Sequence, residues 1–459
     1  MDPHIREDRS DGRHAAIKHR PVRRTAIAGF LAGTAAALTP LPLTASDADA
    51  GEPAEAAFDP LEGWLVNAST HLRSRVHGLR DNADINPDGA IFDTESHIQE
   101  AVGRIVLERP GDAFLTIGLR PKLTYDDIDR WSARLNIDEA YVDVMATPEA
   151  FLFAGLKRTV SGVANGFNPT DFLNAGKESD GLLRDDDRRA EIAGDIVAGV
   201  EYFTTSGTVT AAVLPEIEQV QETPTRLYLD YQGTFETIDA DFSVNAVVGH
   251  SSALGYNLSA TLGRATILYS EGALHFRRGR DRLSTATVNG QPVTFPDSAD
   301  GDRVYPEIVV GATYTFENGI TLNGEFYHDA RGYSDSEFDD IAALIDRAAP
   351  AFRAGGPAAA SAAGQLGLAA GAAFESPLRR NYLFARLSDI AIGSDFDLSL
   401  VGIHNLDDSS SSARARLTYE PTSADRFELV GEVFAGSDRS EFGLIPFSER
   451  AMLTYRRLF

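Results

Sequence analysis

The sequence has 459 residues and no cysteine, and its 68 acidic and 42 basic residues give a formal net charge of −26. Without cysteine, a disulfide framework, a thiolate metal site and a cysteine nucleophile are excluded. The acidic surplus argues against nucleic acid as a partner, because phosphate binding needs clustered Lys and Arg. A hydrophobic content of 43% argues against intrinsic disorder.

The first 50 residues have the pattern of an export signal. A basic run at 20–24 precedes an apolar stretch at 25–38 that is too short to span a bilayer and suits a signal-peptide core. An N-terminal membrane anchor is the alternative. We therefore expect a signal peptide and leader at 1–50, a short periplasmic segment at 51–62 and one folded domain at 63–459.

Beyond residue 50, the repeated feature is period-2 alternation in segments of about ten residues. In segments 242–248, 320–327 and 427–433, apolar residues alternate with Ser, Thr, Asn and Glu. No apolar run approaches the 18 residues of a transmembrane helix. A soluble sandwich and a membrane barrel would both give this alternation, so the number of strands and the connections between them must separate the two.

Eighteen such segments follow one another along the chain. They lie near 63–80, 98–108, 112–125, 133–146, 150–160, 193–204, 206–215, 225–236, 241–249, 255–263, 265–278, 304–316, 319–333, 378–388, 394–405, 410–420, 425–437 and 446–459. The four long connections, 81–97, 161–192, 279–303 and 334–377, fall on one side of the alternation between strands. This predicts an all-β fold, a single antiparallel transmembrane β-barrel of about 18 strands with short periplasmic turns and long extracellular loops. Sixteen strands are the alternative.

The longest connection has a helical start and a low-complexity end. Residues 336–347 are predicted to form a helix. The Ala/Gly-rich run at 354–373 is expected to be a mobile or partly helical surface loop.

The last segment ends in an aromatic residue on an alternating strand. Ala451, Leu453, Tyr455 and Phe459 share one face. This resembles the assembly signal of Gram-negative outer-membrane barrels, so the resemblance implies that Tyr455 and Phe459 are read by the barrel-assembly machinery. Arg457 departs from the pattern, since those proteins usually hold an apolar residue there.

More broadly, residues 60–459 resemble porin-like barrels of poorly characterised function. The resemblance rests on segment 154–158 and on Asn168-Pro169-Thr170-Asp171. The Trp-Gly pair common between these motifs is absent, and Val160, Ser161 and Gly162 stand there instead. The resemblance implies a location in the outer membrane of a Gram-negative bacterium, with the loop 161–192 folded into the lumen.

That loop supplies the candidate pore constriction. The candidate residues are all acidic: Asp171, Glu178, Asp180, Asp185 and Asp186. An acidic narrow passage predicts a modest preference for cations. The alternatives are a purely structural Asn-Pro-Thr-Asp turn and a solvated charged surface at 184–189.

Charged residues on the polar faces of the strands are candidates for the lumen lining: Asp230, Glu325, Arg414, Arg416, Glu428, Glu432, Arg450 and Arg456. The alternative for each is a salt-bridge network without a role in selectivity.

A calcium motif lies in the first long connection. Asp84, Asn86, Asp88, Ala90 and Glu95 fit the spacing D-x-[DN]-x-[DN]-G-x₅-E, whose oxygens can surround Ca²⁺. An acidic turn is the alternative, because no flanking helices are predicted. No cofactor is required by any other motif.

The sequence therefore favours a passive channel for small hydrophilic solutes and no enzymatic activity. Its expected partners are outer-membrane lipids and those solutes, and both monomer and homotrimer are open. The competing hypotheses are a barrel-borne hydrolase, for which His328 near Asp329 is the nearest candidate, and a plugged structural or adhesin barrel.

Overall fold

The computed structural model describes residues 63–80, 83–174, 177, 181–218, 220–288, 291–297, 303–374 and 377–459. The chain divides into two units, 1–60 and 61–459, and the described residues belong to the second. The predicted signal peptide and leader at 1–50 and the segment 51–62 lie outside the described residues.

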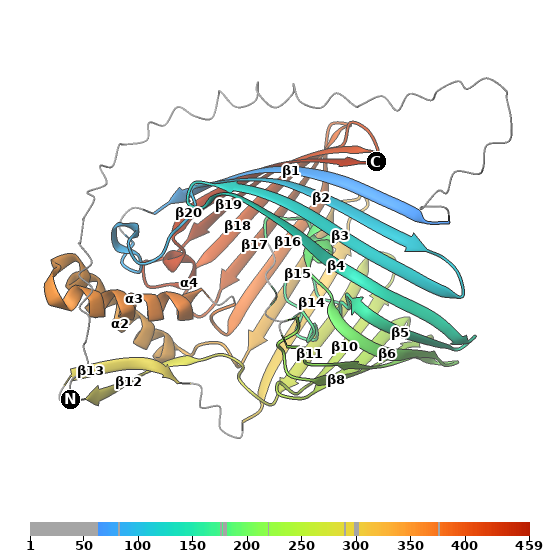
Figure 1. Cartoon of the computed structure of the whole chain (residues 1–459), viewed down its shortest axis with the longest axis horizontal. Helices are drawn as coiled ribbons and strands as arrows, with labels where there is room; N and C mark the ends of the chain where they lie inside the picture. The colour runs from blue at the N-terminus through green and yellow to red at the C-terminus, as the bar shows by residue number, and fades with distance from the viewer. Residues whose placement is uncertain are drawn as a thin grey trace, which may run out of the picture. The chain divides into compact units, whose positions relative to one another are not determined.

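Eighteen antiparallel strands form one closed sheet, because β1 pairs with both β2 and β20 (Figure 1). The strands are β1 (Leu65–Leu79), β2 (His97–Arg109), β3 (Ala113–Asp126), β4 (Arg130–Thr147), β5 (Ala150–Lys157), β6 (Asp195–Phe203), β7 (Gly207–Leu214), β8 (Arg226–Phe235), β9 (Ala240–Val248), β10 (Ala253–Leu262), β11 (Thr266–His275), β14 (Tyr305–Thr315), β15 (Thr321–Asp329), β16 (Asn381–Ile392), β17 (Phe396–Asn405), β18 (Ser411–Tyr419), β19 (Asp425–Ala435) and β20 (Phe447–Leu458). Each predicted segment corresponds to one of these strands. The prediction of an 18-stranded barrel is confirmed.

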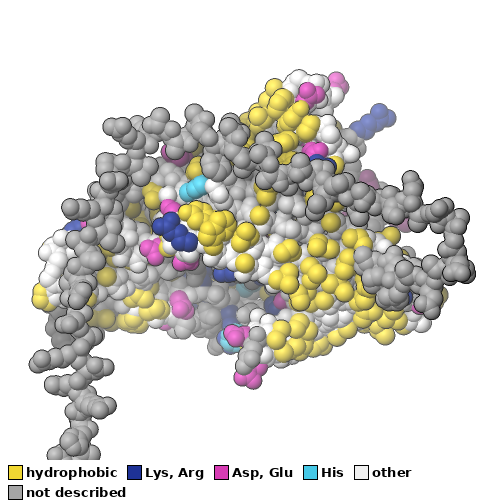
Figure 2. All heavy atoms as spheres, turned by 45° about the horizontal axis from the view of Figure 1, so that its top comes forward, with side chains coloured by type: hydrophobic (Ala, Val, Ile, Leu, Met, Phe, Trp, Pro, Cys, Tyr) yellow, Lys and Arg dark blue, Asp and Glu magenta, His cyan; other side chains and the backbone are white. Residues whose placement is uncertain are grey.

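The apolar side chains of the strands point outward and the polar ones inward. On β19, Leu429 and Val433 are 52% and 53% exposed, whereas Glu428 and Glu432 are buried. Strand β15 repeats this arrangement, with Phe326 exposed and Glu325 buried. A soluble sandwich would bury the apolar face. The inverted pattern excludes that alternative, and Figure 2 shows hydrophobic side chains gathered on the outer face of the barrel.

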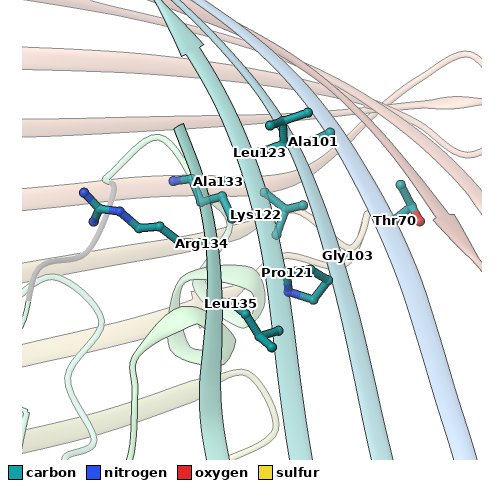
Figure 3. Close-up of a pocket in the computed structure, with 10 residues that line it drawn as sticks. Thr70, Ala101, Gly103, Pro121, Lys122, Leu123, Ala133, Arg134 and Leu135 are labelled. Carbon is teal, nitrogen blue, oxygen red and sulfur yellow. The ribbon is translucent and has the colours of Figure 1, made fainter. Parts of the chain in front are cut away.

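A shallow groove crosses the outer face of β1–β4 (Figure 3). It has a volume of about 530 Å³ and is lined by the apolar Pro121, Leu123 and Leu135 beside the small Thr70 and Gly103. A Cβ on Gly103 would lie 3.0 Å from Pro121 Cγ, so glycine fits under the proline ring. The groove therefore belongs to the apolar outer surface. Among the described residues, no helix is both long enough and apolar enough to cross a membrane.

All the long connections join their flanking strands at one end of the barrel, which we call the long-loop end. They carry the remaining elements: η1 (Pro87–Gly89), α1 (Asp185–Glu191), β12 (Arg282–Val288), β13 (Gln291–Asp297), α2 (Asp335–Ala354), η2 (Gly356–Ala358), α3 (Ala359–Ala373) and α4 (Glu441–Leu444). The opposite, short-turn end has tight connections such as 204–206 and 316–320. The predicted sorting of long loops is thus present.

The connection between β15 and β16 differs from its prediction. Helix α2 begins with a capping box, in which Ser334 and Glu337 bond each other's backbone N–H, and it continues well past residue 347. The Ala/Gly-rich run, predicted to be mobile or partly helical, is helical over most of its length: it forms η2 and α3. The hairpin β12–β13 was not predicted. The helices pack at the long-loop end (Figure 1), where they bury Leu344 and Leu366 completely.

These elements share one hydrophobic core, which we call the cap. Its members come from four connections that are distant in sequence, and they include Ile85 after β1, Leu283 of β12, Leu378 before β16 and Leu444 of α4. Burial of these side chains against α2 and α3 removes apolar surface from water. The cap is the largest hydrophobic cluster of the described residues.

Candidate pore constriction

The described residues of the connection between β5 and β6 are 158–174, 177 and 181–194, and they contact the inner face of the barrel. These residues form hydrogen bonds with side chains that project inward from two walls of the barrel. One wall includes β9 and β11, and the other includes β16 and β19. The resemblance implied that this loop folds into the lumen, and this stays a prediction. We call this connection the lumen loop.

A single carboxylate on β11 holds the start of the lumen loop. Glu271 has no exposed surface, and it accepts hydrogen bonds from the backbone N–H groups of Val163 (2.9 Å), Ala164 (3.1 Å) and Thr170 (2.8 Å). The Thr170 hydroxyl donates a fourth bond of 2.8 Å. Gly162 has a φ of +108°, and a Cβ there would lie 2.9 Å from the carboxylate. Only glycine allows this close approach.

A second carboxylate on β15 holds the next turn. Glu325 accepts bonds from the N–H groups of Asn165 (2.6 Å) and Gly166 (3.0 Å). The ring of Phe167 stacks on Tyr327 with centroids 4.1 Å apart and planes 6° apart. Charge-assisted bonds from backbone N–H groups are among the stronger protein hydrogen bonds, so these two glutamates fix the loop to this wall.

Asp171 fastens the Asn-Pro-Thr-Asp turn. Its Oδ1 accepts bonds from Asn174 Nδ2 (2.9 Å) and from the N–H of Ser161 (3.3 Å), and its own N–H donates to Asn168 O (3.2 Å). Burial raises the pKa of Asp171 above its ordinary value. The carboxylate is therefore occupied within the loop, as the structural-turn alternative expected.

Helix α1 joins the lumen loop to the opposite wall through arginines. Asp185 bonds Arg386 on β16 at 2.6 Å, and Asp187 bonds Arg426 on β19 at 2.6 Å. Burial alone would raise the pKa of Asp185, but the adjacent Arg386 holds this pKa below its ordinary value. Arg386 thus favours the ionised form of Asp185.

The end of α1 is bound by a third set of strands. Glu191 forms ion pairs with Arg73 on β1 and with Arg120 on β3, the latter at 3.2 Å. Arg120 also forms a bidentate pair with Asp138, at 2.8 and 2.9 Å. Although burial opposes it, Arg73 lowers the pKa of Glu191. The lumen loop is therefore attached on both sides of the lumen.

The other predicted lumen residues lie on inward faces and are mostly paired. Glu428 bonds Arg416 at 3.0 Å, and Glu432 bonds Arg450 at 2.6 Å and Arg414 at 3.6 Å. Further such residues are the buried Asp230, which accepts a 2.8 Å bond from Gln232, the buried Glu325 and the half-buried Arg456. Asp186 pairs with Arg184 at 3.2 Å. Glu178 and Asp180 lie outside the described residues.

Several residues that hold the lumen loop were missed, notably Glu271, Glu191 and Arg426. Alternation does place Glu271 and Arg426 on the polar faces of their strands. It contains no information about which loop residue each would meet, because these contacts join positions more than 100 residues apart.

The candidate calcium residues make structural contacts. Asp84 pairs with Arg353 (2.8 Å) and Arg439 (3.4 Å), and Asn86 Oδ1 accepts a 2.9 Å bond from the N–H of Ile91. Asp88, Ala90 and Glu95 are exposed. Within the described ranges, no group of three His, Asp or Glu residues is arranged for a metal. These contacts favour the acidic-turn alternative, and calcium binding stays a prediction.

Two further sets of residues concern the alternatives and the C-terminus. His328 bonds Asn381 at 2.8 Å, whereas Asp329 is buried on the opposite face of β15, so the two do not form a catalytic pair. Tyr455 donates a 2.7 Å bond to Asp425, and Phe459 is 74% exposed. Both aromatic residues are thus near the short-turn end.

No family model and no curated protein matches the sequence. Among solved structures, the chain is similar to OccAB1 of Acinetobacter baumannii, with a TM-score of 0.49 and 9% identity over 86% of this chain and 96% of that one. It is also similar to OccK11 (OpdR) of Pseudomonas aeruginosa, with a TM-score of 0.48 and 11% identity over 87% and 97% of the two chains. For OprD of the same organism the TM-score is 0.47, at 9% identity over 87% and 97%.

Proposed function

We propose that the chain is an outer-membrane channel for the passive diffusion of small hydrophilic solutes. The observation that carries this proposal is a closed barrel whose polar lumen is crossed by an anchored loop. A polar lumen can hold water, and a loop fixed across it limits the size of what passes. His328 bonds Asn381 and lies on the face of β15 opposite to Asp329, which does not support the hydrolase alternative.

The proposal that the barrel lies in a membrane rests on its apolar outer surface. Strand residues such as Leu135, Leu429 and Val433 are more than half exposed to the surroundings, which is unfavourable in water and favourable in lipid. Closed barrels leave no unpaired strand edge in a bilayer. The outer membrane of a Gram-negative bacterium, insertion by the barrel-assembly machinery and recognition of Tyr455 and Phe459 belong to this proposal.

The lumen loop is the proposed constriction. In it, Asp185 pairs with Arg386 at 2.6 Å and Asp186 pairs with Arg184 at 3.2 Å. Because both acids are paired, we expect only a weak cation preference, in contrast to the stronger effect that an unpaired acidic ring would have. Asp171 serves the proposed constriction by holding the turn.

Single-channel recording in planar bilayers tests the function. We expect stepwise conductance in KCl from protein whose folding is confirmed by heat-modifiable electrophoretic mobility. A folded barrel without conductance would favour the plugged structural alternative.

Charge substitution tests the constriction. The double substitution Asp185→Asn with Asp186→Asn removes the acidic partner of Arg386 and leaves Arg184 paired with Glu428, so the net charge at α1 becomes more positive and the reversal potential in a salt gradient should shift toward anions. The matched control is Asp395→Asn in the exposed turn between β16 and β17. Equal reversal potentials in the two variants would move the selectivity element away from α1.

A further inference from the structure

A polar cavity of about 700 Å³ lies between the start of the lumen loop and the inner faces of β7–β10. The loop contributes residues 160–163, and the turn at 205–207 places the cavity toward the short-turn end. Its volume is within the range of about 300–1,000 Å³ that is usual for small-molecule sites. It forms part of the space that the lumen loop leaves open.

The lining is made of groups that both donate and accept hydrogen bonds. Hydroxyl and amide side chains predominate, and they are Ser161, Thr205, Ser206, Thr208, Gln232, Thr234, Ser243 and Asn257. The ionisable lining residues are Glu236 and Asp241, and none of the lining residues is Lys, Arg or His. Anions therefore meet no counter-charge in this cavity.

Two local bonds keep these groups oriented without exhausting them. Asn257 Nδ2 donates to Ser243 Oγ at 2.8 Å, which leaves the serine proton available to donate. Thr234 Oγ1 donates to Asp241 Oδ1 at 2.7 Å, which leaves acceptor capacity on both groups. A solute with several hydroxyls could exchange its hydrogen bonds to water for bonds of both polarities here.

The barrel wall at β18 and β19 carries side chains that either donate or accept hydrogen bonds, but do not do both. Arg414, Arg416 and Arg426 can only donate, Glu428 and Glu432 in ionised form can only accept, and these groups bind each other. A neutral solute would have to compete with those ion pairs for each bond. The two walls therefore differ in the solutes for which they can replace water.

We propose that the cavity along β7–β10 is a subsite for neutral polyols of monosaccharide size on the permeation route. The proposal rests on the channel function above and adds its substrate class. Hydroxyl and amide groups supply the bonds, and the two carboxylates at its rim disfavour anionic sugar acids of the same size.

The first test uses the wild-type protein in proteoliposomes. Initial swelling rates are measured in isotonic sorbitol and in potassium gluconate, with a potassium ionophore present so that charge balance does not limit the second rate. Both solutes have six carbons, and they differ in charge. We expect faster entry of sorbitol. Equal or faster entry of gluconate would overturn the proposal and assign permeation to the arginine wall.

The second test removes two hydroxyls and keeps the acids. Thr208→Val with Ser243→Ala should slow sorbitol entry by about fivefold or more, because each lost hydrogen bond lowers partitioning by roughly that factor. The KCl conductance should be unchanged. The matched control, Thr418→Val with Ser399→Ala, makes the same chemical changes on β18 and β17 and should leave the sorbitol rate unaltered.

The outcomes separate the two proposals. Sorbitol rates that fall equally in the variant and the control would overturn the subsite while the channel stands. An unaltered sorbitol rate in the Thr208 and Ser243 variant would do the same and would leave the acids as a cation site. Absence of KCl conductance in the wild type would overturn the channel, and the subsite with it.

Discussion

The lumen loop and the connection between β15 and β16 are both long, but polar contacts and small apolar clusters hold the first, whereas one large hydrophobic core holds the second. The lumen loop is attached by hydrogen bonds and ion pairs, with Glu271 and Glu325 on one wall and arginines on the other. The β15–β16 connection folds into two helices that share the hydrophobic core of the cap. A loop inside a wet lumen can be positioned by directional polar contacts, whereas one outside it can exclude water by packing.

The lumen loop and the cap should therefore respond differently to amino-acid substitutions. The lumen loop packs Phe172, Leu173 and Leu182 in small apolar clusters, but its backbone N–H groups depend on a few carboxylates. The loss of one carboxylate leaves several of these N–H groups without an acceptor. The cap distributes its stability over side chains from four connections. The predictions below test the contrast, beginning with the largest expected effect.

Removing the carboxylate of Glu271 should release the start of the lumen loop. Glu271→Leu takes away the acceptor for three N–H groups and one hydroxyl, which we expect to cost about 4 kcal/mol of local stability. Amide hydrogen exchange at Val163, Ala164 and Thr170 should accelerate strongly. The matched control is Glu317→Leu in the exposed turn after β14. Exchange that is as slow as in the control would show that packing, not Glu271, holds the loop.

The cap should loosen as the pH rises through neutrality. Glu441 of α4 is buried, and it accepts bonds from Tyr382 Oη (2.5 Å), Asn405 Nδ2 (2.7 Å) and the N–H of Leu378 (3.2 Å). Burial, assisted by the nearby Asp408, raises the pKa of Glu441 from 4.5 to about 7. The folded state thus holds the proton more tightly than the unfolded state. This contribution is complete below pH 4.5, and it is lost as the pH rises through about 7.

A shift of this size corresponds to roughly 3 kcal/mol between the two ends of that window. Proteolysis of the cap, measured from pH 5 to pH 8, should become faster with pH. Glu441→Gln keeps a neutral side chain at every pH and should remove the dependence. A dependence that persists in this variant would exclude Glu441 as its origin.

The start of α2 should contribute a smaller amount. Ser334→Ala removes the side-chain bond to the Glu337 N–H within the capping box, at an expected cost of about 1 kcal/mol. Hydrogen exchange in the first turn of α2 should accelerate by a factor of about five. Ser361→Ala, on the exposed side of α3, is the matched control. Equal exchange rates in the two variants would mean that tertiary packing alone fixes the start of α2.

Sequence reasoning predicted the barrel better than either long connection. Each strand has apolar and polar residues in alternation within its own sequence, so the eighteen strands and the positions of the long loops could be predicted from short segments of the sequence. The cap could not, because 11 of the 15 residues of α3 are Ala or Gly and the helix shows little contrast between its faces. Its core depends on Ile85, Leu283 and Leu444, which belong to other connections. For the lumen loop, Asp185 and Asp186 were singled out, but their partners on the barrel wall, Arg386 and Arg426, follow only from the closed barrel.

The smallest expected effects come from replacing two glycines with alanine. The change in stability should have opposite signs in the cap and in the lumen loop. Gly367 is exposed on α3, and a Cβ there would meet nothing within 4 Å. Gly367→Ala should therefore stabilise the cap by roughly 0.5–1 kcal/mol, because alanine loses less backbone entropy in a helix. At Gly166 in the lumen loop, a Cβ would lie 2.7 Å from the Phe384 ring and 2.8 Å from Glu325 Oε2.

Gly166→Ala should therefore destabilise the lumen loop, because the added methyl group displaces either the ring or the carboxylate that accepts the loop's N–H bonds. Hydrogen exchange in the two regions measures both effects on the same scale. The two stability changes should have opposite signs, because the lumen loop packs closely against the barrel wall at Gly166, whereas α3 has an exposed outer face at Gly367. A stabilising effect at Gly166 would show that the lumen loop has room to move away from β15, and the polar attachment described for Glu325 would then be weaker than its hydrogen bonds indicate.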